Sequence, residues 1–256
     1  MPSNLAEYYD CVINWEKRLV REMPLLEEVA RSAGRRVLVP ACGTGGHVVA
    51  LAERGFSVLG FDADADALSV ARARIESQMK SIEAAQGEAL VVQLTMEEAG
   101  PLGPNYDAAF CLGNALPGLS APGQLRAAFE GMAAALRPGG IFFTQNLNYD
   151  LRWREKARWF PVLSGETKDE EVLLVKFADY EADLINFHVM FLARRKSGGT
   201  WESIVKTSQQ SPLFQARLAE LLTQTGFSKL QFWGDYRQSP FDPEKSSDLI
   251  ILAEKA

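Results

Sequence analysis

Residues 37–52 read VLVPACGTGGHVVALA and combine a short apolar run, a glycine-rich segment and a second apolar run. The run Val37–Val39 is short and apolar, as in a buried parallel strand, and Pro40 ends it because proline has no backbone N–H to donate. Gly43 and Gly45 permit a tight turn whose backbone can approach a ligand closely. The apolar residues that follow favour a helix packed on the sheet. The stretch therefore predicts a strand, a glycine turn and a helix N-terminus.

An acidic residue ends the next predicted strand, residues 57–62, which read SVLGFD. Asp62 lies nineteen positions after Gly43, close to the spacing of about 20 at which a carboxylate reaches the hydroxyls of a bound ribose. Asp62 and the adjoining Ala63 are therefore candidates for contact with a nucleoside.

Two cofactor types fit these strands. A dinucleotide-binding fingerprint has a third small residue three positions after its second glycine, where this chain has Val48. The run ACGTG at 41–45 instead resembles the first motif of class I S-adenosylmethionine-dependent methyltransferases, which makes Ala41 a further cofactor candidate. An NAD-dependent oxidoreductase is the alternative that the remaining motifs must test.

The composition limits the possible partners. The chain has 256 residues, 47% of them hydrophobic, and a formal net charge of -6. An acidic chain without a basic stripe is not expected to bind nucleic acid. Its three irregularly spaced cysteines and two isolated histidines predict neither a disulfide framework nor a metal site, and no apolar run could span a bilayer. We expect a cytoplasmic protein that acts on a small molecule, with a homo-oligomer left open.

The N-terminal segment has a helical pattern and is expected to lie as a lid over the cofactor crevice, as in small-molecule methyltransferases. Pro24 is expected to divide it, with a second helix over 25–31. Arg18 is a candidate to bind the carboxylate of the cofactor's methionine part, because a guanidinium can bind a carboxylate through two parallel hydrogen bonds. A solvated charge on an amphipathic helix is the alternative.

A helix over 66–86 and a strand over 89–94 are expected next. Thr95 and Met96 follow this strand, where many class I methyltransferases carry an acid and an apolar residue beside the adenine. Thr95 offers only a hydroxyl to the adenine amino group. Met96 can either pack on the adenine ring or fill the core.

The fourth predicted strand, 105–112, leads into a loop at 113–118. In a doubly wound sheet whose order reverses between strands one and four, this loop and the glycine turn flank one crevice. Leu112 is then a cofactor candidate. Asn114 can present a donor and an acceptor to a substrate and is the one catalytic candidate, although a turn residue is the alternative.

Three short motifs narrow the resemblance. CLGN at 111–114, RPGG at 137–140 and NYD at 148–150 are similar to the glycine/sarcosine N-methyltransferase branch of class I methyltransferases, and the similarity extends over about 6–234. It implies S-adenosyl-L-methionine as cofactor and a Rossmann-like, doubly wound α/β fold with a mostly parallel seven-stranded sheet. Val48 and the RPGG element argue against an NAD-dependent oxidoreductase.

The remaining elements of the core complete that sheet and its covering helices. The RPGG run is expected to form a sharp turn between a helix and the fifth strand. The predicted helices are 123–136 and 213–224, and the predicted strands are 141–146, 229–234 and 248–253.

Residues 151–210 interrupt the alternation of strands and helices. Their alternating pattern predicts antiparallel strands over 171–180, 182–195 and 201–208. We expect this inserted β layer to roof the active site, and the methyltransferase core to consist of 1–150 and 211–256. Arg152, Tyr180 and His188 are candidates for the acceptor pocket, with a hydrogen-bonded packing role as the alternative for His188.

The predicted reaction is methyl transfer from S-adenosylmethionine to a small molecule, with an amine nitrogen favoured because a neutral amine needs no strong base. An O-methyltransferase and a non-catalytic cofactor-binding protein are the alternatives. The resembled enzymes grip the glycine carboxylate with an arginine at the position that Leu147 holds here. Because leucine offers neither charge nor donor, we expect an acceptor other than glycine.

Overall fold

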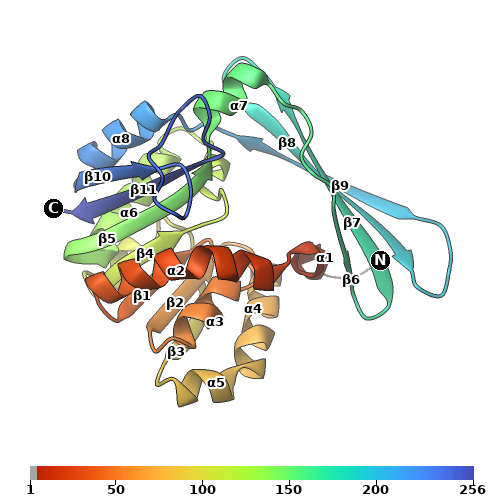
Figure 1. The fold of residues 1–256 in the computed structure, drawn as a ribbon, viewed down its shortest axis with the longest axis horizontal. Helices are drawn as coiled ribbons and strands as arrows, with labels where there is room; N and C mark the ends of the chain where they lie inside the picture. Colours follow the sequence, from red (N-terminus) through yellow and green to blue (C-terminus); the bar gives the residue numbers. More distant parts are fainter. Residues whose placement is uncertain (1–4) are drawn as a thin grey trace.

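The computed structural model describes residues 5–256, so residues 1–4 of the expected lid lie outside the described residues. A seven-stranded sheet forms the core, in the order β10-β11-β5-β4-β1-β2-β3 (Figure 1). β11 runs against its neighbours, and the other described strands of this sheet are parallel. The strands are β1 (Arg36–Pro40), β2 (Ser57–Asp62), β3 (Glu88–Gln93), β4 (Tyr106–Cys111), β5 (Leu136–Leu147), β10 (Phe227–Trp233) and β11 (Asp248–Lys255). This arrangement confirms the predicted Rossmann-like sheet.

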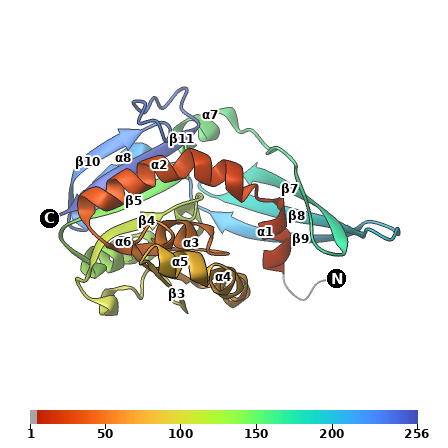
Figure 2. The ribbon, with the colours of Figure 1, turned by 60° about the horizontal axis from the view of Figure 1, so that its bottom comes forward.

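Helices cover both faces of the sheet, since successive residues of its buried strands point to opposite sides. Val37 and Val39 of β1 join the cluster under α2 and α3, whereas Leu38 joins the cluster under α6 and α8. Figure 2 shows α2 lying across β4 and β5. The helices are α2 (Trp15–Ala33), α3 (Gly46–Ala52), α4 (Ala65–Ser77), α5 (Met79–Ala84), α6 (Gln124–Ala135) and α8 (Gln215–Gln224), with 3-10 turns η1 (Gly100–Leu102) and η2 (Leu116–Gly118).

The predicted break at Pro24 is wrong, because α2 continues through it. The chain breaks instead before Asn14, whose side chain caps α2 by accepting a hydrogen bond from the Lys17 backbone N–H at 2.8 Å. Pro24 is exposed, while Leu25 and Leu26 beside it are buried. The free energy gained by burying that apolar face exceeds the free energy lost because proline cannot donate a backbone hydrogen bond.

Two further boundaries differ from expectation. The predicted helix over 66–86 is divided at Gln78 into α4 and α5. The residues 137–140 lie inside β5 and do not form a separate turn before it, although Gly139 has a positive φ of 72°. The Arg137 side chain donates to Asp107 at 2.6 Å and so fastens the start of β5 beside β4.

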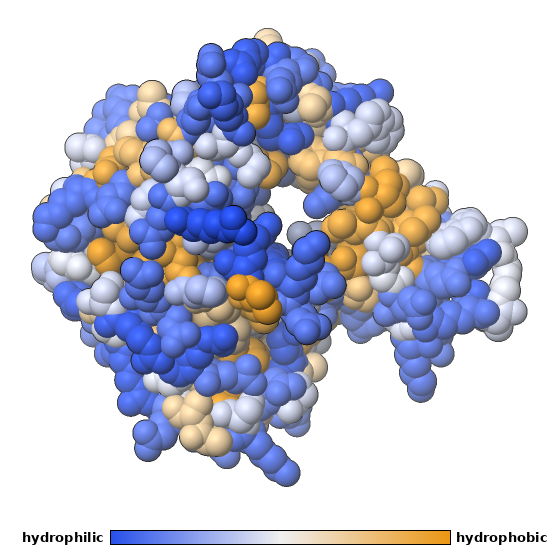
Figure 3. Space-filling model, in the orientation of Figure 1, coloured by the Kyte–Doolittle hydropathy of each residue, from blue (hydrophilic) through white to orange (hydrophobic). Residues whose placement is uncertain are grey.

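A second sheet stands beside the core, and we call it the wing. It has the order β6-β7-β8-β9 and is antiparallel, which confirms the predicted inserted layer and adds β6 to it. Space-filling atoms leave an opening between the core and the wing (Figure 3). The elements are α7 (Tyr149–Glu155), β6 (Leu163–Glu166), β7 (Glu170–Tyr180), β8 (Ile185–Arg195) and β9 (Glu202–Gln210).

Helix α1 (Leu5–Val12) packs on the wing. Tyr8 is buried with Leu174 and Phe191, and its hydroxyl donates to Glu170 at 2.6 Å. A Cβ added at Gly165 would lie 2.1 Å from a backbone oxygen of α1, so only glycine fits at this crossing. Within residues 5–256, no helix is both long and apolar enough to cross a membrane.

Candidate active site

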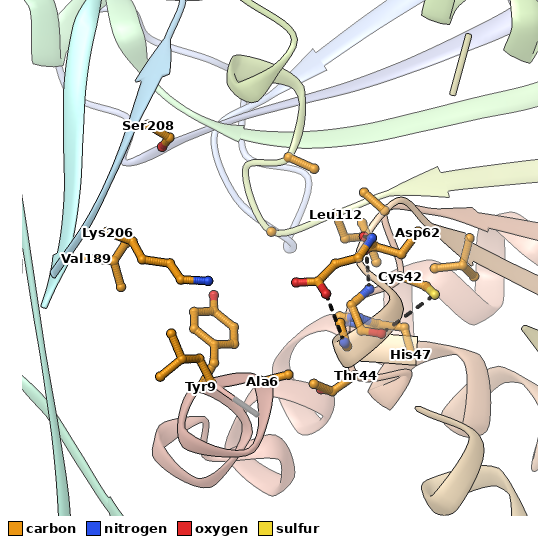
Figure 4. Close-up of a pocket in the computed structure, with 18 of the residues that line it drawn as sticks. Ala6, Tyr9, Cys42, Thr44, His47, Asp62, Leu112, Val189, Lys206 and Ser208 are labelled. Atoms are coloured by element: carbon orange, nitrogen blue, oxygen red, sulfur yellow. Dashed lines mark hydrogen bonds between the residues drawn. The ribbon is translucent and has the colours of Figure 1, made fainter. Parts of the chain in front are cut away.

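A cavity of about 540 Å³ lies where β1, β2 and β4 end, between the core and the wing. Figure 4 shows side chains from both parts around it, among them Asp62 and Leu112 from the core and Val189 and Lys206 from the wing. Tyr9 of α1 also lines it. Its size is within the range of about 300–1,000 Å³ that small-molecule sites occupy.

The glycine turn forms one wall of the cavity. A Cβ added at Gly43, where φ is 53°, would meet no protein atom within 4 Å, so the space beside this backbone is open to a ligand. A Cβ at Gly46 would lie 2.3 Å from the Trp15 ring, which packs on the helix start. Ala41 also lines the cavity and has a positive φ of 51°, a strained conformation of the kind that collects at binding sites.

Asp62 is held at the cavity wall by two backbone groups. One carboxylate oxygen accepts from the Gly43 N–H at 2.8 Å, and the other accepts from the Asp64 N–H at 2.9 Å. A carboxylate oxygen has a second lone pair, so both oxygens can still accept from a ligand. This arrangement can bind two vicinal hydroxyls, as the predicted ribose contact requires.

Arg18 lines the cavity next to Gly113, and its Nε donates to the Glu22 carboxylate at 3.2 Å. Glu22 is 1% exposed and also accepts from Arg21 at 2.6 Å and from the Nε2 of His47 at 2.7 Å. Because the Nε is held by Glu22, the two terminal nitrogens of the Arg18 guanidinium can point into the cavity and bind an anionic group there. The sequence predicted Arg18 but not the buried carboxylate that orients it.

Glu22 stays ionised in this buried network. Burial by itself would raise its pKa, but the hydrogen bond from His47 and the charge of Arg18 outweigh burial and lower the pKa of Glu22 to about 2. Burial also lowers the pKa of His47, so that ring is neutral and donates to the carboxylate. His47 therefore belongs to the network that orients Arg18, in addition to its place in the first turn of α3.

Asp10 connects α1 to the glycine turn. Its carboxylate accepts from the Thr44 hydroxyl at 2.6 Å, from the Trp15 indole at 2.7 Å and from Arg74 at 2.6 and 2.7 Å. The Arg74 Nε also donates to the Thr44 carbonyl at 3.0 Å. These contacts hold α1 at one end of the cavity, and no local sequence pattern predicts them.

Replacing Asp10 by alanine is expected to increase amide hydrogen exchange in α1 at least tenfold. Charge-assisted hydrogen bonds each contribute about 1.5–3 kcal/mol, and a tenfold change corresponds to about 1.4 kcal/mol. Hydrogen exchange followed by mass spectrometry measures the effect. Glu7→Ala, an exposed position on the same helix, is the control; equal exchange in the two variants would show that Asp10 does not hold α1.

Three predicted cofactor residues do not line the cavity. Met96 is buried in the core with its sulfur 4.0 Å from that of Cys111, which favours the core-filling alternative. The Thr95 hydroxyl donates to Glu98 at 2.9 Å. Ala63 accepts from the Gln93 side chain at 3.0 Å. Leu112, which was predicted together with these three residues, does line the cavity.

Asn114 has the geometry of a turn residue, with φ at 62°. Its side-chain oxygen accepts from the Leu147 backbone N–H at 2.9 Å, and its side-chain amide donates to the Tyr149 hydroxyl at 3.0 Å. The side chain therefore joins the loop after β4 to the end of β5. The neighbours Gly113 and Ala115 line the cavity instead.

His188 is not among the residues that line the cavity, whereas its strand neighbour Val189 is. Its ring stacks on Phe177 with centroids 4.4 Å apart, and its Nδ1 lies 2.8 Å from the Thr207 hydroxyl. The packing alternative therefore fits His188.

Arg152 and Tyr180 lie near the base of the wing and do not line the cavity. The Arg152 guanidinium lies 4.1 Å from the centroid of the Phe160 ring. The Tyr180 hydroxyl donates to the Ala157 carbonyl at 3.1 Å. Both side chains hold the segment that connects α7 to the wing.

The reversed last strand, the glycine turn and the acid that ends β2 together define a class I methyltransferase fold. A family model described as "Methyltransferase domain" matches residues 37–140. Residues 37–140, which carry the glycine turn, Asp62 and the strands β1 to β4, therefore match a methyltransferase domain.

The chain is similar in sequence to named N-methyltransferases and similar in fold to solved structures. The chain is 34% identical to the rat glycine N-methyltransferase over 45% of this chain, which spans only 41% of that relative. It is 24% identical to the glycine/sarcosine N-methyltransferase of Parasynechococcus marenigrum over 98% of this chain and 83% of the relative. DesVI from Streptomyces venezuelae has a TM-score of 0.78 with 18% identity over all of both chains. S-adenosylmethionine-bound CalS10, an amino pentose methyltransferase from Micromonospora echinaspora, has 0.66 with 19% identity over 95% and 92%.

Proposed function

We propose that this enzyme methylates an amine nitrogen of a small molecule that binds between the core and the wing. The observation that carries the proposal is the two-sided cavity, in which the glycine turn and Asp62 face side chains of β8 and β9. Relatives named for glycine and sarcosine N-methylation, and a neighbour named for amino pentose methylation, support an amine acceptor.

The residues around the cavity fit S-adenosylmethionine. Asp62 can accept from the ribose hydroxyls, the open backbone at Gly43 admits the ligand, and Arg18 can bind its carboxylate. When bound, the cofactor supplies an electrophilic methyl group on a sulfonium. The protein then has to hold the acceptor nitrogen in line with that methyl group, and such alignment supplies about 7–11 kcal/mol of rate acceleration in favourable cases.

An amine acceptor also fits the state of the histidine that lines the cavity. His47 is neutral, buried and bonded to an ionised Glu22, so it is not set up to remove a proton from a hydroxyl. An amine that arrives uncharged attacks with its own lone pair and releases its proton afterwards. A hydroxyl acceptor would need a base positioned beside it before the transfer.

Two measurements test the proposal. Calorimetry with S-adenosylmethionine is expected to show one site per chain, and turnover with a library of amines and alcohols is expected to yield S-adenosylhomocysteine with amines. Turnover confined to hydroxyl compounds would contradict the amine acceptor. Cofactor binding without turnover of any compound in cell extract would indicate the non-catalytic alternative.

Glycine is expected to be a poor substrate. The side chain of Leu147 packs against the apolar core, and its backbone N–H is already bonded to Asn114. A glycine carboxylate directed at this position would be desolvated without a partner. Initial rates with purified enzyme should show no saturation with glycine below about 1 mM, the upper end of ordinary KM values.

The companion variant Leu147→Arg, which restores the arginine of the resembled enzymes, should raise kcat/KM for glycine. Saturation of the unmodified enzyme by micromolar glycine would overturn the prediction. Unchanged cofactor affinity in Leu147→Arg, measured by calorimetry, is the control that the variant is folded.

A further inference from the structure

We propose that the methyl acceptor carries an anionic group, a phosphate or a carboxylate, apart from its methylated nitrogen, and that Lys176 and Lys206 of the wing bind this group. The inference rests on the proposed function and specifies the class of acceptor.

The two lysines share the inner face of the wing. Lys176 of β7 is paired in register with Val189 of β8, and Val189 is paired with Lys206 of β9. Residues directly opposite each other in antiparallel strands point to the same face, and Val189 and Lys206 line the cavity. The lysines are two strand spacings apart, about 9–10 Å between backbones, with a small apolar side chain between them. Two flexible ammonium groups at this separation can converge on one anion above Val189.

Both ammonium groups lack a carboxylate partner among residues 5–256. Some lysines elsewhere in the chain are paired, such as Lys196 with Glu166 at 2.7 Å and Lys229 with Glu254 at 2.6 Å, while exposed ones such as Lys17 and Lys80 are in no ion pair with a described residue either. Figure 4 shows Lys206 extended across the cavity toward Tyr9. Lys206 lines the cavity and Lys176 lies on the same face of the wing, so this side of the crevice carries a local positive charge where an anion can bind.

The environment of Lys176 adds a second observation. Its side chain is partly buried, with its Nζ 5.9 Å from the centroid of the Phe160 ring. Burial lowers the pKa of Lys176, and the charge of Arg18 lowers it further. Holding a partly desolvated ammonium costs free energy, and a bound anion beside it would offset that cost.

The carboxylates of the crevice lie on one side of it. Asp62 and Asp64 line the core side, where hydroxyl donors of a cofactor can bind them and where Arg18 can bind the cofactor carboxylate, and the lysines lie on the wing side. This division places the anion of the acceptor away from the carboxylates and its nitrogen between the two sides. It also explains how an acceptor acid can bind without a cation at Leu147.

The test compares amines in matched pairs that differ in a remote anion: glucosamine 6-phosphate with glucosamine, phosphoethanolamine with ethanolamine, and 4-aminobutyrate with butylamine. The enzyme is expected to prefer the anionic member of at least one pair by about tenfold or more in kcat/KM, and the pairs distinguish phosphate from carboxylate. Lys176→Met combined with Lys206→Met should abolish this preference. Equal turnover of the members of every pair, or a preference that persists in the double variant, would overturn the proposal.

Binding of inorganic phosphate gives a readout that does not depend on finding the acceptor. Millimolar phosphate should raise the melting temperature of the S-adenosylhomocysteine-loaded protein and should not raise that of the double variant. Lys245→Met, which changes an exposed lysine paired with Asp242, is the matched control and should behave as the unmodified chain. If no amine is turned over, the melting temperatures alone decide. An equal shift with phosphate in the unmodified chain and the double variant, or no shift in either, overturns the proposal.

Calorimetry with S-adenosylmethionine separates this inference from the proposed function. The double variant should retain cofactor affinity within about tenfold, or 1.4 kcal/mol. If the unmodified chain does not bind S-adenosylmethionine, the proposed function is refuted. If it binds the cofactor but shows no preference for anionic acceptors, only the role of the lysines is refuted.

Discussion

Replacing Asp62 by alanine is expected to weaken S-adenosylmethionine binding by about 1.5–3 kcal/mol or more, the contribution of a charge-assisted hydrogen bond. The carboxylate has two tasks at once. It accepts from the backbone N–H groups of Gly43 and Asp64, and its remaining lone pairs face the cavity. Alanine therefore removes the ribose acceptor and also releases the glycine turn that shapes the site.

Calorimetry measures the affinity, and circular dichroism confirms that the variant is folded. Glu76→Ala, an exposed acidic residue of α4, removes the same charge from the protein without touching the cavity and should leave the affinity unchanged. An Asp62→Ala protein that is folded and binds as tightly as the unmodified chain would refute the ribose contact.

Glu22→Gln is expected to lower the free energy of unfolding by about 3 kcal/mol at neutral pH, since one pKa unit corresponds to about 1.36 kcal/mol. The pKa of Glu22 falls from 4.5 in the unfolded reference to about 2 in the native protein. The native state thus binds its proton less readily, and the resulting stability is complete above about pH 4.5. It is lost as the pH falls through the interval from 4.5 to about 2.

Urea unfolding of both proteins at several pH values tests this prediction. The difference in unfolding free energy between the unmodified chain and Glu22→Gln should be largest near neutrality and shrink below pH 4.5. Glu28→Gln, an exposed position on the same helix, should show no such dependence. A difference in unfolding free energy that stays constant down to about pH 2 would mean that Glu22 stabilises the protein through packing and not through its charge.

The sequence predicted most of the sheet and the cofactor side of the site because their signals are local. The glycine turn, the acid at the end of β2 and the short apolar runs each depend on neighbouring residues. Contacts between distant segments left no such signal: Asp10 joins Arg74 across 64 positions. The Arg18–Glu22 spacing predicts a pair on one helix face, but nothing in the sequence marks Glu22 as buried.

The wing shows a different limit. β8 reads INFHVMFLARR, and the residues that share a face with Val189 up to Ala193 are all apolar, whereas His188 lies on the mixed face. Alternation therefore marks the apolar face but does not say whether that face packs on a helix or lines a cavity. Val189 and Lys206 reach the cavity wall because of the way the wing stands beside the core, which no local pattern predicts.

Helix α1 is fastened at both rims of the cavity, to the wing through Tyr8 and to the core through Asp10. A hinge movement that widened the crevice would have to break the contacts of α1 at one rim or carry the helix with it. The hydrogen bonds of Tyr8 and Asp10 thus couple the position of the wing to the position of the glycine turn.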